Sequence, residues 1–333
     1  MLRYIARKAV GWFLMIAVAT NLTYFLANAF LKPASNYTAL RPPRTPAQIN
    51  RSLAQFNLNP DKPILDRWWD WISGIVTHFD WGGQSPTGGG SVNEQVAYRI
   101  FVSGQLVIAS TILSIVIGGV GLGVYTASRQ YKAGDRVWQG ISVISFNTPS
   151  AVASLGVVLA AIWLNQSVGD TLLPVAGAQS PPEVSGFWAV LGSRVVHAIL
   201  PTISLTFISY AGYHLLQRSL LLDNINSDYV RTARSKGGLT RQQAIYRHGL
   251  RTSIIPVATQ VAFAMPALFT GAVITETVFA WHGMGEYFTK TISTNDVHGA
   301  VAVAAFGALM TAIGAILADL VVVALDPPRI RVS

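Results

Sequence analysis

Long apolar runs constrain the fold of this chain more than any other feature of its sequence. A helix that crosses the hydrocarbon core of a bilayer needs about 20 mostly apolar residues. Six stretches meet this requirement, so we predict an all-α integral membrane protein with six transmembrane helices. The predicted spans are roughly Val10–Leu31, Phe101–Tyr125, Val137–Leu164, Val195–Leu216, Ser253–Val278 and Gly299–Leu325.

The composition agrees with a chain whose main solvent is lipid. Of its 333 residues, 51% are hydrophobic and 12% are charged, and the mean hydropathy is +0.42. The charged fraction is about half of that in soluble domains. Polar residues and prolines interrupt the third and fifth stretches, but membrane helices tolerate proline where neighbours satisfy the freed backbone groups. The interrupting residues are Asn147, Thr148, Pro149, Pro256 and Pro266.

The first apolar run has the alternative of being a secretory signal peptide. Arg3, Arg7 and Lys8 precede it, and Ala27-Asn28-Ala29 resembles a cleavage site. The run is about 22 residues long, however, whereas the apolar part of a signal peptide has about 7–15 residues. We therefore predict a first transmembrane helix that is retained.

Lysine and arginine set the orientation of membrane helices, because they accumulate in cytoplasmic loops. With the N-terminus inside, most of the 24 lysine and arginine residues lie on the cytoplasmic side, and the two short outer loops hold only Arg194 and Lys290. We therefore predict that both termini are cytoplasmic and that residues 32–100 lie outside. The cytoplasmic cations are Arg3, Arg7, Lys8, Arg129, Lys132, Arg136, Arg218, Arg231, Arg234, Lys236, Arg241, Arg247, Arg251, Arg329 and Arg331.

The charge distribution and the motifs that are absent exclude several classes of function. The loop asymmetry explains the net charge of +9, so nucleic-acid binding is not expected. The sequence has no cysteine, and its six histidines lack the spacing of helical metal ligands, so no metal site is predicted. It also has no Gly-x-x-x-x-Gly-Lys-Ser/Thr phosphate loop and no nucleophile–base constellation. We predict that the chain has no catalytic residues, binds no cofactor itself and is not an enzyme.

The predicted outer segment, residues 32–100, is too long to be a simple connection. It opens with a proline-rich stretch, continues into a helical pattern over Pro46–Phe56, and then has a second amphipathic stretch over Ile64–Ile72. Tryptophan favours membrane interfaces, so we predict a helix along the outer leaflet, with a docking surface for an external partner as the alternative. The tryptophans concerned are Trp68, Trp69 and Trp71.

The loop between the fourth and fifth stretches carries clear signals of local structure. Asn226 or Ser227 is suited to cap a short helix, with Asp228 near the positive end of its dipole. Gly237 and Gly238 are expected to end that helix, because glycine adopts the left-handed conformation of a helix C-terminus most easily.

A second helix is predicted in the same loop. Thr240 and Gln243 have the spacing of a capping box. A solvated basic loop would explain the arginines of this region, but it would not require two capped helices around a glycine pair. The loop 217–252 is therefore the candidate functional element.

The run Asp228–Gly237, with Arg247–Arg251 and Pro256 beyond it, resembles the EAA loop of ATP-binding-cassette (ABC) importer permeases in its dipeptide/oligopeptide version. The glutamate that opens the general EAA pattern is absent here, as it is in the peptide-permease branch. The segment 32–63 matches poorly. Further resemblance lies in Met1–Arg7, Leu173–Gly177, His197–Pro201, Glu276–Gly285 and Asp326–Arg331.

The resemblance implies a type I ABC importer permease fold that forms half of the translocation path for di- or oligopeptides across the cytoplasmic membrane. It implies a second homologous permease subunit, two cytoplasmic ATPase subunits that hold ATP and Mg²⁺, and an extracytoplasmic peptide-binding protein as partners, besides membrane lipid. In that family the loop docks on the ATPase as a coupling helix. The implied ATPase-coupling residues are Asp228, Tyr229, Arg231, Thr232, Ala233, Lys236, Gly237, His248 and Leu250.

Three residues inside the predicted spans are candidates for lining the path, namely Asn147, Pro149 and Glu276. Ionisable groups in a membrane are costly and often functional, although we expect Glu276 to hydrogen-bond locally rather than to contact substrate. The expected organisation is residues 1–31 for the N-terminal cytoplasmic end and first helix, 32–100 for the extracytoplasmic segment, 101–325 for the permease core with its coupling loop 217–252, and 326–333 for a cytoplasmic tail.

Two alternatives remain open from the sequence. The same fold could carry another cargo, such as nickel, glutathione or a sugar-derived compound. A secondary transporter is less favoured, because it would require ionisable residues near the bilayer midplane and inverted repeats, and neither is evident.

Overall fold

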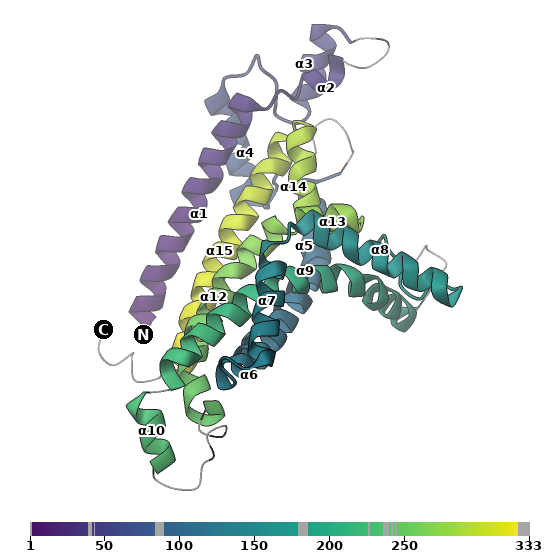
Figure 1. The fold of residues 1–333 in the computed structure, drawn as a ribbon. Helices are drawn as coiled ribbons and strands as arrows, with labels where there is room; N and C mark the ends of the chain where they lie inside the picture. The colour runs from purple at the N-terminus through teal and green to yellow at the C-terminus, as the bar shows by residue number, and fades with distance from the viewer. Residues whose placement is uncertain are drawn as a thin grey trace. The chain divides into compact units, whose positions relative to one another are not determined.

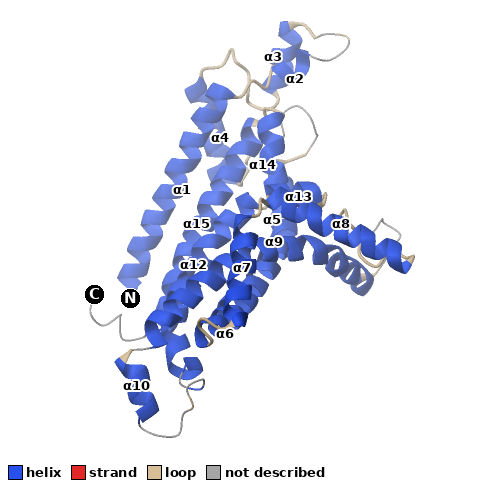
Figure 2. Cartoon of the chain, in the orientation of Figure 1, coloured by secondary structure: helices blue, strands red, loops and turns tan. Residues whose placement is uncertain are grey.

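The computed structural model of the chain is built from helices joined by loops, and no strand occurs among the residues it describes (Figure 2). These residues fall into two compact units. The first comprises Met1–Ser103, Phe269–Val273 and His282–Ala312, and the second comprises Gly104–Leu268, Ile274–Trp281 and Ile313–Ser333. The described residues are 2–38, 42, 44–83, 90–178, 186–225, 227–235, 240, 243 and 245–325.

Several helices confirm a multi-pass membrane fold. Five of the helical stretches in the described part of the chain are long and apolar enough to cross a bilayer. They correspond to the first, second, fourth and sixth predicted spans and to the second half of the third. The helices concerned are α1 (Leu2–Phe30), α5 (Val92–Ser114) with η1 (Ile115–Leu122) and α6 (Gly123–Ser128), α8 (Ser150–Val168), α9 (Phe187–Ile225) and α15 (Val297–Leu325).

The third predicted span, Val137–Leu164, is not one continuous helix, and this part of the prediction was wrong. The chain forms α7 (Ala133–Asn147) and α8, with Thr148 in an extended conformation and Pro149 at the N-cap of α8. Proline lacks an amide hydrogen, and it disfavours helical geometry in the residue before it. α7 therefore ends at Asn147, at the polar and proline-containing interruption of the predicted span.

The fifth predicted span is also divided, into α12 (Leu250–Gly271) and α13 (Val273–Val278). The side chains at 263 and 265–271 lie outside the described residues. That α12 crosses the membrane, and with it the total of six spans, therefore stays a prediction.

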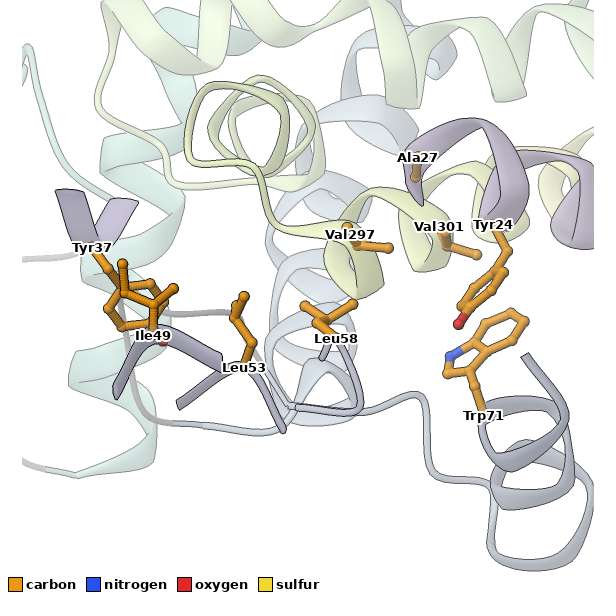
Figure 3. Packing of buried hydrophobic residues seen from close by; sticks show 9 residues of the cluster. All are labelled: Tyr24, Ala27, Tyr37, Ile49, Leu53, Leu58, Trp71, Val297 and Val301. Atoms are coloured by element: carbon orange, nitrogen blue, oxygen red, sulfur yellow. The ribbon is translucent and has the colours of Figure 1, made fainter. Parts of the chain in front are cut away.

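The first unit has a core in which α1 packs with the segment that follows it. Tyr24 of α1 is fully buried, and its ring stacks on Trp71 with the ring centroids 4.6 Å apart (Figure 3). The cluster joins α1 and α15 to α2, α3 and α4 of the same unit through buried apolar side chains. The shorter helices of this unit are α2 (Ser35–Thr38), α3 (Pro46–Ala54), α4 (Ile64–His78) and α14 (Met284–Ser293).

The three clustered tryptophans of α4 do not all face outward. Trp71 is 4% exposed, and its indole N–H donates to the Trp81 carbonyl. Trp68 is half-buried and donates to Asn21 of α1 at 2.6 Å. Trp69 alone of the three is largely exposed, at 64%. Of the three tryptophans, Trp69 is therefore the one available for contact with the outer leaflet or with a partner, and such contact stays a prediction.

The second unit is organised around α9. Glycines on η1 and α6 allow these segments to approach α9 closely: a Cβ atom on Gly118 would lie 2.2 Å from the Tyr210 carbonyl oxygen. Small residues permit such close approach of membrane helices. A separate apolar cluster of Ala161, Leu200 and Phe279 joins α8, α9 and the segment after α13.

Candidate functional site

The loop 217–252 begins as an extension of α9 beyond the apolar run predicted for the fourth span. The helix continues to Ile225 and is followed by α10 (Asp228–Ser235), which Figure 1 shows beyond the ends of α9 and α12. The Ser227 carbonyl accepts from the amides of Val230 and Arg231 at 3.1 Å, so α10 starts at the predicted place.

The predicted cap of α10 differs in detail from the structure. The Ser227 hydroxyl donates to the Asn224 carbonyl at 2.6 Å, which binds the start of α10 to the end of α9. Asn226 lies outside the described residues. Asp228 is exposed in the first turn of α10, where the interaction of its carboxylate with the positive end of the helix dipole is favourable.

The second capping signal is confirmed. The Thr240 amide donates to the Gln243 side-chain oxygen at 2.9 Å, and the Gln243 amide donates to the Thr240 hydroxyl at 3.3 Å. These two reciprocal bonds define a capping box. A five-residue π-helix, η2 (Ile245–Gly249), follows and leads directly into α12.

The structure places only part of the predicted coupling residues. Asp228, Arg231 and Thr232 are exposed on α10, available to a partner, and Leu250 is half-buried at the start of α12. The backbones of Tyr229, Ala233 and His248 lie in α10 and η2, but their side chains are outside the described set. Lys236 and Gly237 lie outside it altogether, so the conformation expected at Gly237 stays a prediction.

The second part of the loop, from η2 to the start of α12, packs against α6 and α9 of the second unit. Ile245 of η2 is 1% exposed and packs with Val124, Ala127 and Leu221, and Leu250 packs against the same cluster. An added Cβ on Gly249 would lie 3.2 Å from Leu221 Cδ1. This part of the loop therefore belongs to the same apolar core as α6 and α9.

α9 and α7 are joined by an ion pair between Arg218 and Asp135 that the sequence does not indicate. Asp135 at the start of α7 is 1% exposed and accepts from Arg218 Nε at 2.8 Å and from Nη2 at 2.9 Å. These bonds hold the pKa of the Asp135 carboxyl below its usual value, although burial opposes the shift, and a bond from the Tyr131 amide supports it. From the sequence, Arg218 is only one of the predicted cytoplasmic cations, and the available signal for the pair is an aspartate near the start of a predicted span.

The three candidate path residues do not form one described cluster. Asn147 and Pro149 are exposed at the junction of α7 and α8, where the Asn147 side chain donates back to the Val143 carbonyl. Glu276 of α13 is fully buried. Its neighbour Thr275 has its hydroxyl 3.3 Å from the Ser154 hydroxyl of α8. A role for these residues in the path stays a prediction.

Comparison with known proteins accounts for this architecture. The model of the family "Binding-protein-dependent transport system inner membrane component" matches residues 119–331, which include α7, α9, the loop and α12. This chain belongs to that family. The family member described here is therefore a multi-pass membrane component of a transport system.

Individual relatives extend along the whole length of this family member. It is 37% identical over 333 residues, covering 100% of both chains, to the oligopeptide transport system permease protein OppB of Mycobacterium tuberculosis strain H37Rv. From Bacillus subtilis strain 168, the oligopeptide permease AppB is 27% identical (98% of this chain, 99% of the relative). The dipeptide permease DppB of the same strain is 28% identical (98% and 97%).

Proposed function

We propose that this chain is one permease subunit of an ATP-driven importer and forms half of the path that carries di- or oligopeptides across the cytoplasmic membrane. The single observation that carries the proposal is the full-length identity of 37% to an oligopeptide permease, without a gap in coverage of either chain. The chain works with a second permease subunit, two ATPase subunits that bind ATP and Mg²⁺, and an external peptide-binding protein.

The coupling element in this proposal is the loop 217–252. A coupling element must be a short cytoplasmic helix that offers exposed side chains to an ATPase and transfers displacement to the spans. The supporting observations are the exposed Asp228, Arg231 and Thr232 on α10 and the burial of Ile245 against Leu221 of α9. ATP hydrolysis then takes place on the partner, and this chain converts the closure of the ATPases into movement of its helices.

The proposed orientation has a direct test. With both termini cytoplasmic and residues 32–100 outside, single cysteines introduced at Ser85 and Ser235 are expected to react with a membrane-impermeant maleimide from opposite faces. The chain has no native cysteine, so each label reports one site. Labelling of both positions from the same face would contradict this topology, and labelling after permeabilisation serves as the control for reactivity.

Function and coupling are tested together in proteoliposomes that contain the complete complex with its peptide-binding protein. We expect the wild-type complex to import peptide and to show peptide-stimulated ATP hydrolysis. Ala233→Glu and Gly237→Val are expected to abolish the stimulation. If Gly237 ends α10 in the left-handed conformation, a β-branched side chain costs about 1–2 kcal/mol there, which would misdirect the helix.

The matched control is Arg234→Gln, which changes a predicted solvated charge in the same helix and should keep most of the stimulation. Membrane insertion and complex assembly are measured for each variant. Wild-type stimulation in both Ala233→Glu and Gly237→Val would show that the loop is not the coupling element. Transport of nickel, glutathione or a sugar-derived compound in place of peptide would contradict the proposed cargo.

A further inference from the structure

One face of α9 carries buried residues to which the sequence analysis assigned no role. Tyr210, His214, Gln217 and Leu221 follow one another at intervals of four, three and four residues, so they lie on the same side of the helix. All four are buried, and the last three are fully inaccessible to solvent. We call this face the α9 seam.

We propose that the α9 seam carries the displacement of α10 and η2, the two short helices of the loop 217–252, into α6 and α7, and that His214 and Gln217 are positioning residues for transport. The inference rests on the proposed coupling function of the loop. Every contact that supports it lies within the second unit.

The upper contact of the seam is made by His214. Its Nδ1 lies 2.7 Å from the Ser142 hydroxyl of α7, and its Nε2 lies 2.9 Å from the Thr126 hydroxyl of α6. A neutral imidazole has one donor and one acceptor nitrogen, and a hydroxyl can satisfy either. His214 therefore links three helices with both ring nitrogens engaged.

The lower contact joins α9 to the start of α12, where the loop 217–252 ends. Gln217 Nε2 donates to the Ser253 hydroxyl of α12 at 2.7 Å, and this hydroxyl lies 3.3 Å from the Leu250 carbonyl, to which it donates. Gln217 can occupy this position because α6 has a glycine opposite it: a Cβ on Gly123 would lie 2.7 Å from Gln217 Cγ. Leu250 begins α12 directly after η2, so the hydrogen bonds connect α9 to the end of the coupling loop.

Apolar packing completes the connection one turn further along. Leu221 packs against Ile245 of η2, and Gly249 approaches the same leucine. Among the described residues, η2 and the start of α12 are thus held to α9 by an apolar contact at Leu221 and a hydrogen bond at Gln217, and α9 is held to α6 and α7 by His214. Buried hydrogen bonds are directional and costly to leave unmade, so these elements are expected to move together and to keep their register.

The test separates positioning from stability in the reconstituted complex with its partner subunits and peptide-binding protein. Ser253→Ala leaves the Gln217 amide without its acceptor and should lower thermal stability. Combining it with Gln217→Met replaces both partners by apolar groups of similar size, a change that is often nearly neutral. We expect the double variant to regain stability but to hydrolyse about 3- to 10-fold more ATP per peptide imported than wild type, as loss of one buried hydrogen bond permits.

The matched control is Thr259→Val, because the one hydrogen bond of this α12 hydroxyl within the described part of the chain goes to the Ile255 carbonyl of its own helix. It should keep the wild-type ratio of ATP to peptide. If the double variant is stable and has the wild-type ratio, the seam does not transmit displacement. Should it fail to assemble, Ser142→Ala at the upper contact replaces it, and an unchanged ratio there overturns the inference equally. A wild-type complex without peptide-stimulated hydrolysis would instead overturn the proposed function, and the seam with it.

Discussion

Gly118→Ala is expected to destabilise the chain by about 3 kcal/mol, at the upper end of the cost of overpacking. The physical reason is the distance of 2.2 Å between an added Cβ and the Tyr210 carbonyl oxygen. The atom met is main chain, so no rotamer change can relieve the overlap, and α9 itself has to move. The free energy of unfolding in mixed detergent micelles measures the effect, and complex assembly provides a second measure.

The neighbouring glycine supplies the control for this prediction. Gly119 is also buried in η1, but an added Cβ there would meet Val257 Cγ1 at 3.7 Å, an ordinary van der Waals contact. Gly119→Ala is therefore expected to be neutral, or slightly stabilising because alanine loses less backbone entropy than glycine. Equal stability of the two variants would show that η1 and α9 do not approach as closely as the structure indicates.

Asp135→Ala is expected to cost about 3 kcal/mol, because removal of one partner of a buried ion pair leaves the other charge uncompensated. Arg218 retains one neighbour, since the Gln139 side-chain oxygen, in the orientation that the hydrogen-bond network requires, accepts from the guanidinium at 2.8 Å. This places the expected cost at the lower end of the usual range for such losses. Arg136→Ala removes an exposed charge from the same turn of α7 and should change stability little.

The pH dependence of this effect follows from the lowered pKa of Asp135. A carboxyl with a depressed folded pKa stabilises the protein fully above its unfolded value of about 3.9. That contribution is lost as the pH falls through the folded value. The difference in stability between wild type and Asp135→Ala should therefore be constant between pH 5 and 8 and should shrink below about pH 4. A difference that persists unchanged into strong acid would show that the carboxylate charge is not its source.

The α9 seam and the Asp135–Arg218 ion pair both hold α9 in place. Both fasten the part of α9 next to the loop to its neighbours, Asp135–Arg218 to α7 and Gln217–Ser253 to α12. Asp135→Ala should consequently impair transport through stability, whereas the double variant at Gln217 and Ser253 should impair coupling at normal stability. Comparison of the two variants in one reconstituted system distinguishes a loss of stability from a loss of coupling between ATP hydrolysis and transport.

Sequence alone was sufficient for the membrane fold class, the family and two local features of the loop, the start of α10 and the capping box that follows it. Run length decides whether a segment can cross a bilayer, and it located five helical stretches that qualify in the described part of the chain. The capping box of Thr240 and Gln243 was equally predictable, because its two hydrogen bonds connect residues three positions apart. Such features depend on neighbours in the chain, and those are visible in the sequence.

Only the tertiary structure decided which buried groups pair and which faces meet. Asp135 and Arg218 are 83 positions apart, and nothing in the spacing of either residue indicates the other. Trp69 and Trp71 are near neighbours of one type, yet one is exposed and the other is buried against Tyr24, because α4 presents them to different sides. Likewise, the loop 217–252 could be singled out from its residues, but the contacts of Ser253 and Ile245 with α9 depend on the approach of helices that the glycines at 118 and 123 permit.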